Sequence, residues 1–168
     1  MWQVKRNMFD KEVTHHVMPV LYGVQGCGKS YLLRKLIKPL DLFSMDSALH
    51  TVTDERLHMS LSKHFIAFLD ELQGVAKTDI DTLKNLITVP YVSVRKFYSQ
   101  ETIKMRQNCS FIGATNRPLN EQIIDSTGMR RFYEIKTKDV INWEAVNSFD
   151  YRAAWLSIDE NDNDGFIK

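Results

Sequence analysis

A glycine-rich run, "GVQGCGKS" at residues 23–30, is the strongest chemical signal in the sequence. It fits the pattern G-x-x-x-x-G-K-[S/T], in which glycines allow a tight turn that directs backbone N–H groups at phosphate oxygens. An apolar run before it and a helical pattern after it favour a nucleotide-binding loop over a chance glycine-rich turn. The predicted nucleotide-binding residues are Gly23, Gln25, Gly26, Cys27, Gly28, Lys29, Ser30 and Tyr31.

Within this loop, two side chains have distinct expected roles toward ATP. We expect the Lys29 ammonium to reach the β- and γ-phosphates and the Ser30 hydroxyl to bind Mg²⁺. Two acids, Asp70 and Glu71, follow the apolar run "FIAFLDE". A buried strand that ends in unpaired carboxylates is costly unless they have a function. We expect Asp70 to hold Mg²⁺ through water and Glu71 to polarise the attacking water.

The alternative for Asp70 and Glu71 is a solvated strand end. A small-molecule kinase is a further alternative for the whole site, but such enzymes usually need only the first acid, and the pair favours hydrolysis. A third apolar run, "FIGATN", ends in Asn116. Its amide is suited to orient the lytic water beside the γ-phosphate, the role called sensor 1. Capping of a turn before Pro118 is the simpler alternative.

Basic residues dominate the segment 92–108, which carries a local net charge of +3. Its pattern predicts two short strands around a polar turn at residues 99–101, a β-hairpin. Basic side chains neutralise phosphates and aromatic side chains stack on bases, so we expect this hairpin to bind DNA. A solvated hairpin with its aromatic residues packed down is the alternative. The predicted DNA contacts are Arg95, Lys96, Phe97, Lys104 and Arg106.

Apolar patterns alternate between strand-like and helical segments along the chain, which predicts an α/β fold with a mainly parallel sheet. In such sheets ligands bind at the carboxyl ends of the strands. Strands are expected at residues 19–22, 41–46, 64–71, 109–116 and 131–136. Helices are expected at residues 2–13, 29–38, 53–61 with Thr53 as its cap, 77–87 and 147–160, the last with Phe149, Trp155 and Ile158 available for burial.

Length and composition indicate a single compact domain in a reducing compartment. The chain has 168 residues, 43% of them hydrophobic, and a formal net charge of +1, so its overall charge identifies no partner. It has two cysteines, no CxxC pair and no apolar run long enough to span a membrane. We divide it into an N-terminal helical segment (1–17), a core (18–138), and a C-terminal helix with a solvated acidic tail (139–168).

Two adjacent arginines, Arg130 and Arg131, lie in "DSTGMRRFYEI" just before an apolar run. Taken alone, they read as surface residues paired with acids such as Asp125 or Glu134, where ion pairs contribute little to stability. The alternative is that they reach out of their own subunit toward an anion.

In order and spacing, "MPVLYGVQGCGKSYLLRKL", "FIAFLDEL", "FIGATNRP" and "DSTGMRRFYEI" resemble the ATPase domain of virulence-associated protein E-like proteins, which group with superfamily 3 helicases and AAA+ ATPases. The T-G-x-R-R-F segment is the most specific mark. The resemblance implies a P-loop NTPase fold of AAA+ type with a five-stranded sheet and a β-hairpin before the sensor-1 strand. It also implies a hexameric ring in which Arg131, with Arg130 beside it, acts in trans on the neighbour's γ-phosphate, while the other site residues act in cis.

Members of that family are encoded by phages and other mobile elements and act in replication, often with a primase or origin-binding domain elsewhere. The resemblance therefore implies Mg²⁺-dependent ATP hydrolysis that powers DNA translocation or unwinding in the bacterial cytoplasm. The alternative is an ATP-dependent assembly switch without helicase activity. No membrane partner is expected under either hypothesis.

Overall fold

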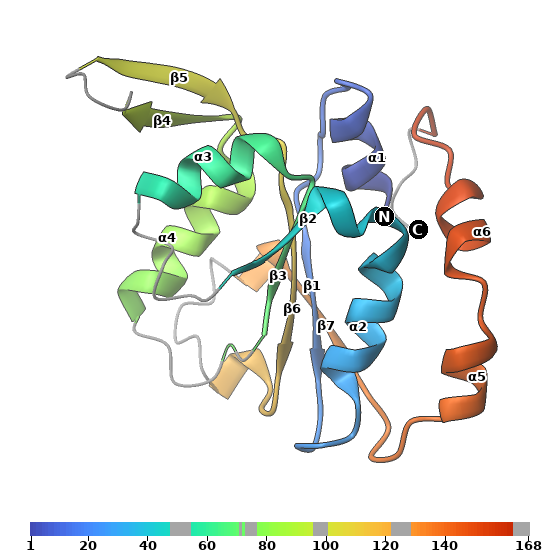
Figure 1. The fold of residues 1–168 in the computed structure, drawn as a ribbon. Coiled ribbons are helices and arrows are strands. Elements are labelled where there is room, and N and C mark those ends of the chain that lie inside the picture. Colours follow the sequence, from blue (N-terminus) through green and yellow to red (C-terminus); the bar gives the residue numbers. More distant parts are fainter. Residues whose placement is uncertain (48–54, 71, 73–76, 96–100, 122–128, 163–168) are drawn as a thin grey trace.

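Five parallel strands form the centre of the molecule, and helices cover both faces of this sheet (Figure 1). The computed structural model describes residues 1–47, 55–70, 72, 77–95, 101–121 and 129–162. The strand order is β2-β3-β6-β1-β7, and every pairing in this sheet is parallel. This confirms the predicted α/β class with a five-stranded parallel sheet. The strands are β1 (Met18–Tyr22), β2 (Ser44–Ser47), β3 (Ile66–Leu69), β6 (Ser110–Thr115) and β7 (Phe132–Lys136).

Strand β6 lies between β1 and β3, although the helix α4 and a β-hairpin separate it from β3 in the chain. In the register, Tyr22 at the end of β1 pairs with Thr115 at the end of β6. Because all five strands are parallel, their last residues share one edge of the sheet, here called the carboxyl edge. The opposite edge, where the strands begin, is called the amino edge.

The helices form two layers, one on each face of the sheet (Figure 1). On one face are α1 (Trp2–Met8), α2 (Lys29–Ile37), α5 (Trp143–Ser148) and α6 (Tyr151–Leu156). On the other are α3 (Glu55–Lys63) and α4 (Lys77–Thr88). Short 3₁₀ turns occur at η1 (Lys38–Phe43), η3 (Leu119–Glu121) and η4 (Met129–Arg131). None of the helices in the described ranges is long and apolar enough to cross a membrane.

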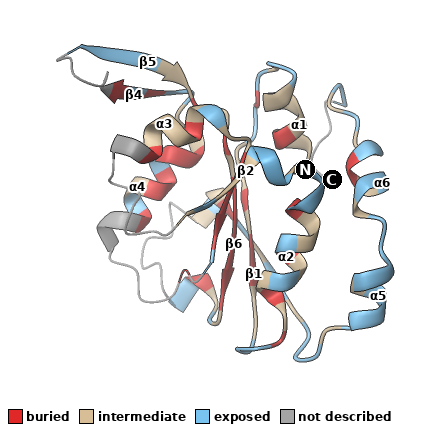
Figure 2. Cartoon of the chain, viewed as in Figure 1, coloured by how far each residue is buried: buried red, intermediate tan, exposed pale blue. Residues whose placement is uncertain are grey.

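Each face of the sheet has its own hydrophobic core, because successive side chains of a strand point to opposite faces. In β1, Met18 and Val20 join the core under α3 and α4, whereas Leu21 joins the core under α2. The inner strands are buried along almost their whole length, while α5 is exposed (Figure 2). Leu33 and Ile37 of α2 are buried, as their helical spacing predicts.

A two-stranded antiparallel hairpin, β4 (Tyr91–Arg95) and β5 (Thr102–Arg106), projects from the amino edge (Figure 1). Its strands confirm the hairpin predicted for residues 92–108. Most of the predicted turn falls within residues 96–100, outside the described residues, as does the predicted helix cap Thr53.

Three predicted elements differ from the structure. The helix predicted for residues 2–13 ends at Met8, because Asp10 has a φ of +57° that does not continue an α-helix. The second strand begins only at Ser44, because η1 continues the turn of α2 in 3₁₀ form through Phe43. The single helix predicted for residues 147–160 is instead two short helices separated at Phe149, because the Asp150 carboxylate accepts from the Ala153 N–H and starts α6 anew. Phe149 is consequently exposed rather than buried, whereas Trp155 is buried and its Nε1 donates to the Leu36 carbonyl at 2.7 Å.

The segment after α6 docks against α1 and is not a solvated tail as far as it is described. Glu160 pairs with Lys5 at 3.5 Å and with Lys11 at 3.2 Å. The indole N–H of Trp2 donates to the Asp162 carbonyl at 2.8 Å. The prediction of a solvated acidic tail is therefore wrong for Glu160, because the basic residues of the first eleven positions provide its partners.

Candidate functional site

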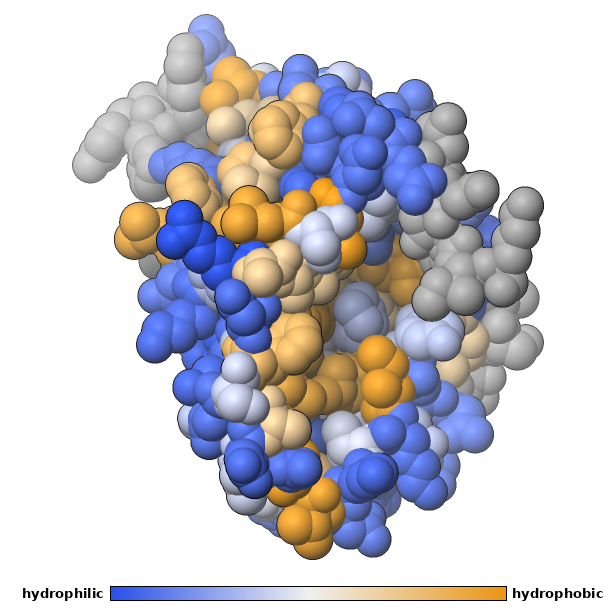
Figure 3. All heavy atoms as spheres, turned by 90° about the vertical axis from the view of Figure 1, so that its right-hand side faces the viewer, coloured by the Kyte–Doolittle hydropathy of each residue, from blue (hydrophilic) through white to orange (hydrophobic). Residues whose placement is uncertain are grey.

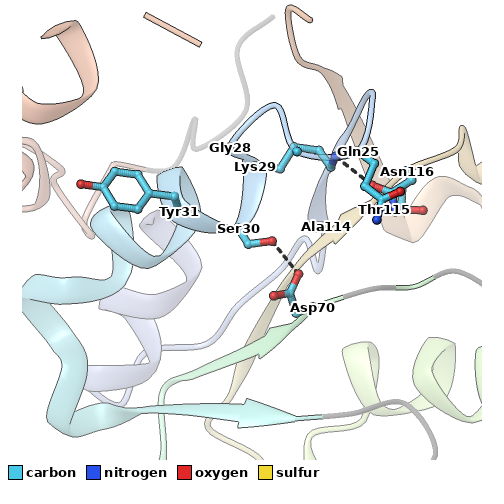
Figure 4. A pocket seen from close by; sticks show the side chains of 10 residues that line it. Gln25, Gly28, Lys29, Ser30, Tyr31, Asp70, Ala114, Thr115 and Asn116 are labelled. Atoms are coloured by element: carbon cyan, nitrogen blue, oxygen red, sulfur yellow. Dashed lines mark hydrogen bonds between the residues drawn. The ribbon is translucent and has the colours of Figure 1, made fainter. Parts of the chain in front are cut away.

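A cleft of about 290 Å³ opens at the carboxyl edge, between the loop that follows β1 and the ends of β3 and β6 (Figure 4). Nearly all its walls come from three segments that the sequence singled out for chemistry. Its lining residues are Gln25, Gly26, Gly28, Lys29, Ser30, Tyr31, Asp70, Ala114, Thr115 and Asn116.

The loop at residues 23–28 depends on glycine at two positions. Gly26 has φ +79° and Gly28 has φ +100°, a left-handed backbone that costs other residues roughly 1–2 kcal/mol. At Gly28 a side chain would also collide, because an added Cβ would lie 2.6 Å from Cη2 of Trp143. Gly28 is the N-cap of α2, so the first free N–H groups of this helix face the cleft. The loop therefore has the backbone geometry that anion binding at a helix N-terminus requires.

Lys29 is buried, with 6% of its surface exposed, and its charge is satisfied by oxygen atoms. Its ammonium donates to the carbonyls of Gly23 at 3.0 Å and Val24 at 2.8 Å. A third bond at 3.0 Å joins it to Oδ1 of Asn116. The structure thus brings the predicted phosphate-binding lysine and the predicted sensor amide into direct contact (Figure 4).

Ser30 and Asp70 form the second contact across the cleft. The Ser30 hydroxyl donates to Oδ1 of Asp70 at 2.6 Å. A hydroxyl and a carboxylate side by side are hard oxygen donors of the kind that Mg²⁺ prefers. Among the described residues there is no cluster of three or more histidine, cysteine or acidic side chains that could hold a metal. Mg²⁺ is usually held by one or two carboxylates together with substrate phosphates and water.

The order of strands explains why these residues meet. Because β6 lies between β1 and β3, its end emerges between the loop after β1 and the acid after β3. Thr115 is buried and its Oγ1 accepts from the Arg117 N–H at 3.4 Å, which holds the chain just beyond Asn116. Glu71 lies outside the described residues.

Arg130 and Arg131 are not part of this cleft. They lie in η4, directly before the first residue of β7, which pairs with Met18 at the amino edge. The five residues of β7 span about 17 Å. Arg130 is exposed, and Nε of Arg131 is buried without a hydrogen-bond partner among the described residues.

The predicted DNA contacts are only partly described. Lys104 is exposed and its ammonium lies 4.5 Å from the ring centroid of Tyr91. Arg106 forms an ion pair with Asp10 and donates to the Lys11 carbonyl at 3.1 Å, so it links the hairpin to the N-terminal segment. The remaining three, the Arg95 side chain, Lys96 and Phe97, are outside the described residues.

Sequence reasoning missed a group of contacts made by the segment after β7. Oγ1 of Thr137 lies 3.4 Å from Sγ of Cys27, and Trp143 packs against Gly28. Glu134 of β7 accepts a hydrogen bond from the Leu119 N–H, just beyond the Asn116 loop. No motif marks these residues, because their positions depend on how the chain returns across the sheet.

Comparison with solved structures shows that this fold occurs elsewhere. Apo structures of the NrS-1 C-terminal region match 90% of the chain at 19–20% identity, with TM-scores of 0.58 and 0.61. The chain covers only 41% and 36% of those two structures. No curated protein matches the sequence.

The family comparison covers almost the whole chain. The model of the virulence-associated protein E-like domain matches residues 2–156 of the 168. This range includes the glycine-rich loop, all five strands of the sheet and both C-terminal helices. The chain therefore belongs to the virulence-associated protein E-like domain family.

Proposed function

We propose that this domain is a Mg²⁺-dependent ATPase of AAA+ type, the motor domain of a superfamily 3-like helicase that acts in the replication of a phage or other mobile element. The observation that carries the proposal is the cleft itself, where Lys29, the Ser30–Asp70 pair and Asn116 meet at the end of three parallel strands. A phosphate loop, a metal-binding acid and a polar residue from an interposed strand are the parts that ATP hydrolysis requires.

The fold also supports the AAA+ assignment. The resemblance implied a five-stranded parallel sheet with a hairpin before the strand that ends in Asn116. Here β6 is the strand that ends in Asn116, it lies in a five-stranded parallel sheet, and the hairpin β4–β5 precedes it in the chain. The family match supports a role in replication.

In the proposed reaction Lys29 exchanges its carbonyl partners for β- and γ-phosphate oxygens and stabilises the charge that develops there. Ser30 and Asp70 would hold Mg²⁺, which neutralises phosphate charge. Asn116 orients the attacking water and Glu71 polarises it. Because Lys29 and Asn116 are already in contact, little rearrangement is needed to position them.

An ATP-dependent assembly switch is the second candidate. The anchoring of Arg106 to Asp10 and Lys11 favours it, because a hairpin fixed at its root is less free to move along DNA. Unwinding of forked DNA by the assembled protein separates the two candidates. Duplex separation that requires ATP supports the motor, and hydrolysis without separation supports the switch.

The proposed chemistry is tested by phosphate release from ATP by Lys29→Ala and Glu71→Gln. Removing a transition-state donor such as Lys29, or the residue that polarises the attacking water, typically lowers turnover by about 10²–10⁴-fold. Lys38→Ala is the matched control, because Lys38 is exposed at the far end of α2. Near-normal hydrolysis in both site variants would refute the assignment.

A further inference from the structure

The phosphate cleft has two ends that differ in chemistry. Lys29 and Asn116 lie at one end, and Tyr31 points away from them at the other (Figure 4). If phosphates bind along the loop, with the γ-phosphate beside Asn116, then the rest of the nucleotide extends toward Tyr31. This direction rests on the proposed function. With this direction, the nucleobase lies close to Tyr31.

At that end two aromatic rings form a corner, here called the aromatic corner and consisting of Tyr31 and Trp143. Their centroids are 5.3 Å apart and their planes meet at 74°. Cη2 and Cζ2 of Trp143 are the ring atoms nearest to Gly28, at 2.6 and 3.1 Å from an ideal Cβ placed there. Both rings remain exposed to a similar extent, 41% for Tyr31 and 45% for Trp143.

The aromatic corner is held in place from both sides. The Tyr31 hydroxyl donates to Oδ1 of Asn147 at 2.8 Å, and the Lys35 ammonium lies 5.3 Å from the centroid of the tyrosine ring. Asn142, the residue before Trp143, caps α5 by accepting a hydrogen bond from the Ala145 N–H at 3.0 Å. A preorganised ring loses little conformational freedom on binding, so these contacts make the corner a rigid surface.

Figure 3 shows the side of the molecule that carries α5 and α6, where apolar side chains gather around a hollow. Phe149 and Tyr151 form a similar aromatic pair farther along this segment, at 4.9 Å between centroids. Of these two aromatic pairs, Tyr31–Trp143 is the one that adjoins the phosphate loop.

We propose that the aromatic corner is the nucleobase subsite of this ATPase, in which the base of a purine nucleoside triphosphate stacks on Trp143 beside Tyr31. Stacking does not depend on a particular pattern of hydrogen bonds, and the larger purine ring gains more from it than a pyrimidine. The stacking residue of this subsite therefore comes from the segment after β7. A bound base links α5 to the phosphate loop.

The test compares ATP with inorganic tripolyphosphate, which contacts the phosphate loop but has no base, by titration calorimetry with Mg²⁺. Trp143→Leu should weaken ATP binding about 5- to 150-fold, the range that stacking of one base supplies. It should leave tripolyphosphate binding within about twofold, and Trp143→Phe should restore most of the ATP affinity. Phe149→Leu is the matched control and should change neither.

Tryptophan fluorescence provides a second readout. ATP should quench the wild-type emission, and Trp143→Phe should lose this quenching while it still binds ATP. If ATP and tripolyphosphate weaken equally in Trp143→Leu, Trp143 only supports the loop and the subsite is refuted. If neither ligand binds to the wild-type protein, the proposed ATPase function itself fails, which is a distinguishable result.

Discussion

Lys29 illustrates at the scale of single residues how the site is prepared for its ligand. Its ammonium is buried and fixed in position, because it donates hydrogen bonds to two loop carbonyls and to Asn116. A phosphate that enters the cleft replaces neutral carbonyl oxygens by charged ones, which form stronger hydrogen bonds with an ammonium. Lys29 therefore forms its strongest hydrogen bonds when an anion binds. Its present contacts already hold it near the position that phosphate binding requires.

Asp70 allows a prediction about metal dependence. If Asp70 holds Mg²⁺ through water, Asp70→Asn removes a charge that orients the metal rather than a direct ligand. Such outer contacts typically change metal affinity or activity by about 10–100-fold. We expect the Mg²⁺ concentration for half-maximal hydrolysis to rise by that factor while saturating Mg²⁺ restores part of the rate. Asp46→Asn, which removes an exposed acid paired with Arg34, is the control. An unchanged Mg²⁺ titration in Asp70→Asn would contradict this role.

Residue types and spacing predicted that Lys29, Ser30, Asp70 and Asn116 would converge, because the ends of parallel strands share one edge. Their specific bonds could not be predicted in this way. Nothing in the sequence marks Asn116 as a partner of Lys29, or Asp10 as a partner of Arg106. Such pairs depend on side-chain directions and on loop paths, which a linear pattern does not contain.

At the scale of elements, strands were easier to predict than helix ends. Strands β3 and β6 are buried on both faces and appear as continuous apolar runs, which are distinctive. The break before α6 was missed, because Asp150 fits a helix interior by pattern yet caps a new helix once the chain turns. The start of β2 was placed too early for a related reason, since 3₁₀ and extended segments of mixed polarity look alike.

The contact between α1 and the segment after α6 leads to a prediction about pH. The backbone N–H of Glu160 and the Lys11 ammonium lower the pKa of this carboxyl from its ordinary value of 4.5. A lowered folded-state pKa contributes stability above pH 4.5, and that contribution is lost as pH falls through the folded value. Glu160→Gln should therefore lower the melting temperature at pH 7 and have a vanishing effect at the acid end.

Thermal unfolding of Glu160→Gln and wild type across this pH range checks the prediction. Glu144→Gln is the control, because Glu144 is an exposed acid of α5 outside this contact. A difference between Glu160→Gln and wild type that grows on acidification would show that the carboxylate is not stabilised by its partners.

At the scale of the whole molecule, the two edges of the sheet carry different functions under the proposal. The ATP cleft lies at the carboxyl edge, whereas η4 with Arg131 and the hairpin β4–β5 lie at the amino edge. Since β7 alone spans about 17 Å, Arg131 is too far from its own cleft to contact a bound phosphate. In the proposed ring, Arg131 would instead reach the cleft of a neighbouring subunit.

This separation predicts that two variants, each inactive alone, recover ATP hydrolysis when they are mixed. Arg131→Ala keeps a complete cleft but lacks the arginine for its neighbour, and Glu71→Gln keeps the arginine but cannot activate water. A trans arginine raises turnover by roughly 10³–10⁵-fold, so each variant alone should be nearly silent. Mixed oligomers place an intact Arg131 beside an intact Glu71 in some interfaces, and phosphate release should reappear there.

The recovered rate should peak near equal proportions of the two variants, because that ratio gives the most mixed interfaces. Arg130→Ala, combined with Glu71→Gln in the same way, shows whether the neighbouring arginine has the same role. A mixture no more active than its parts would place Arg131 outside the catalytic machinery and leave its buried Nε as a structural feature of η4.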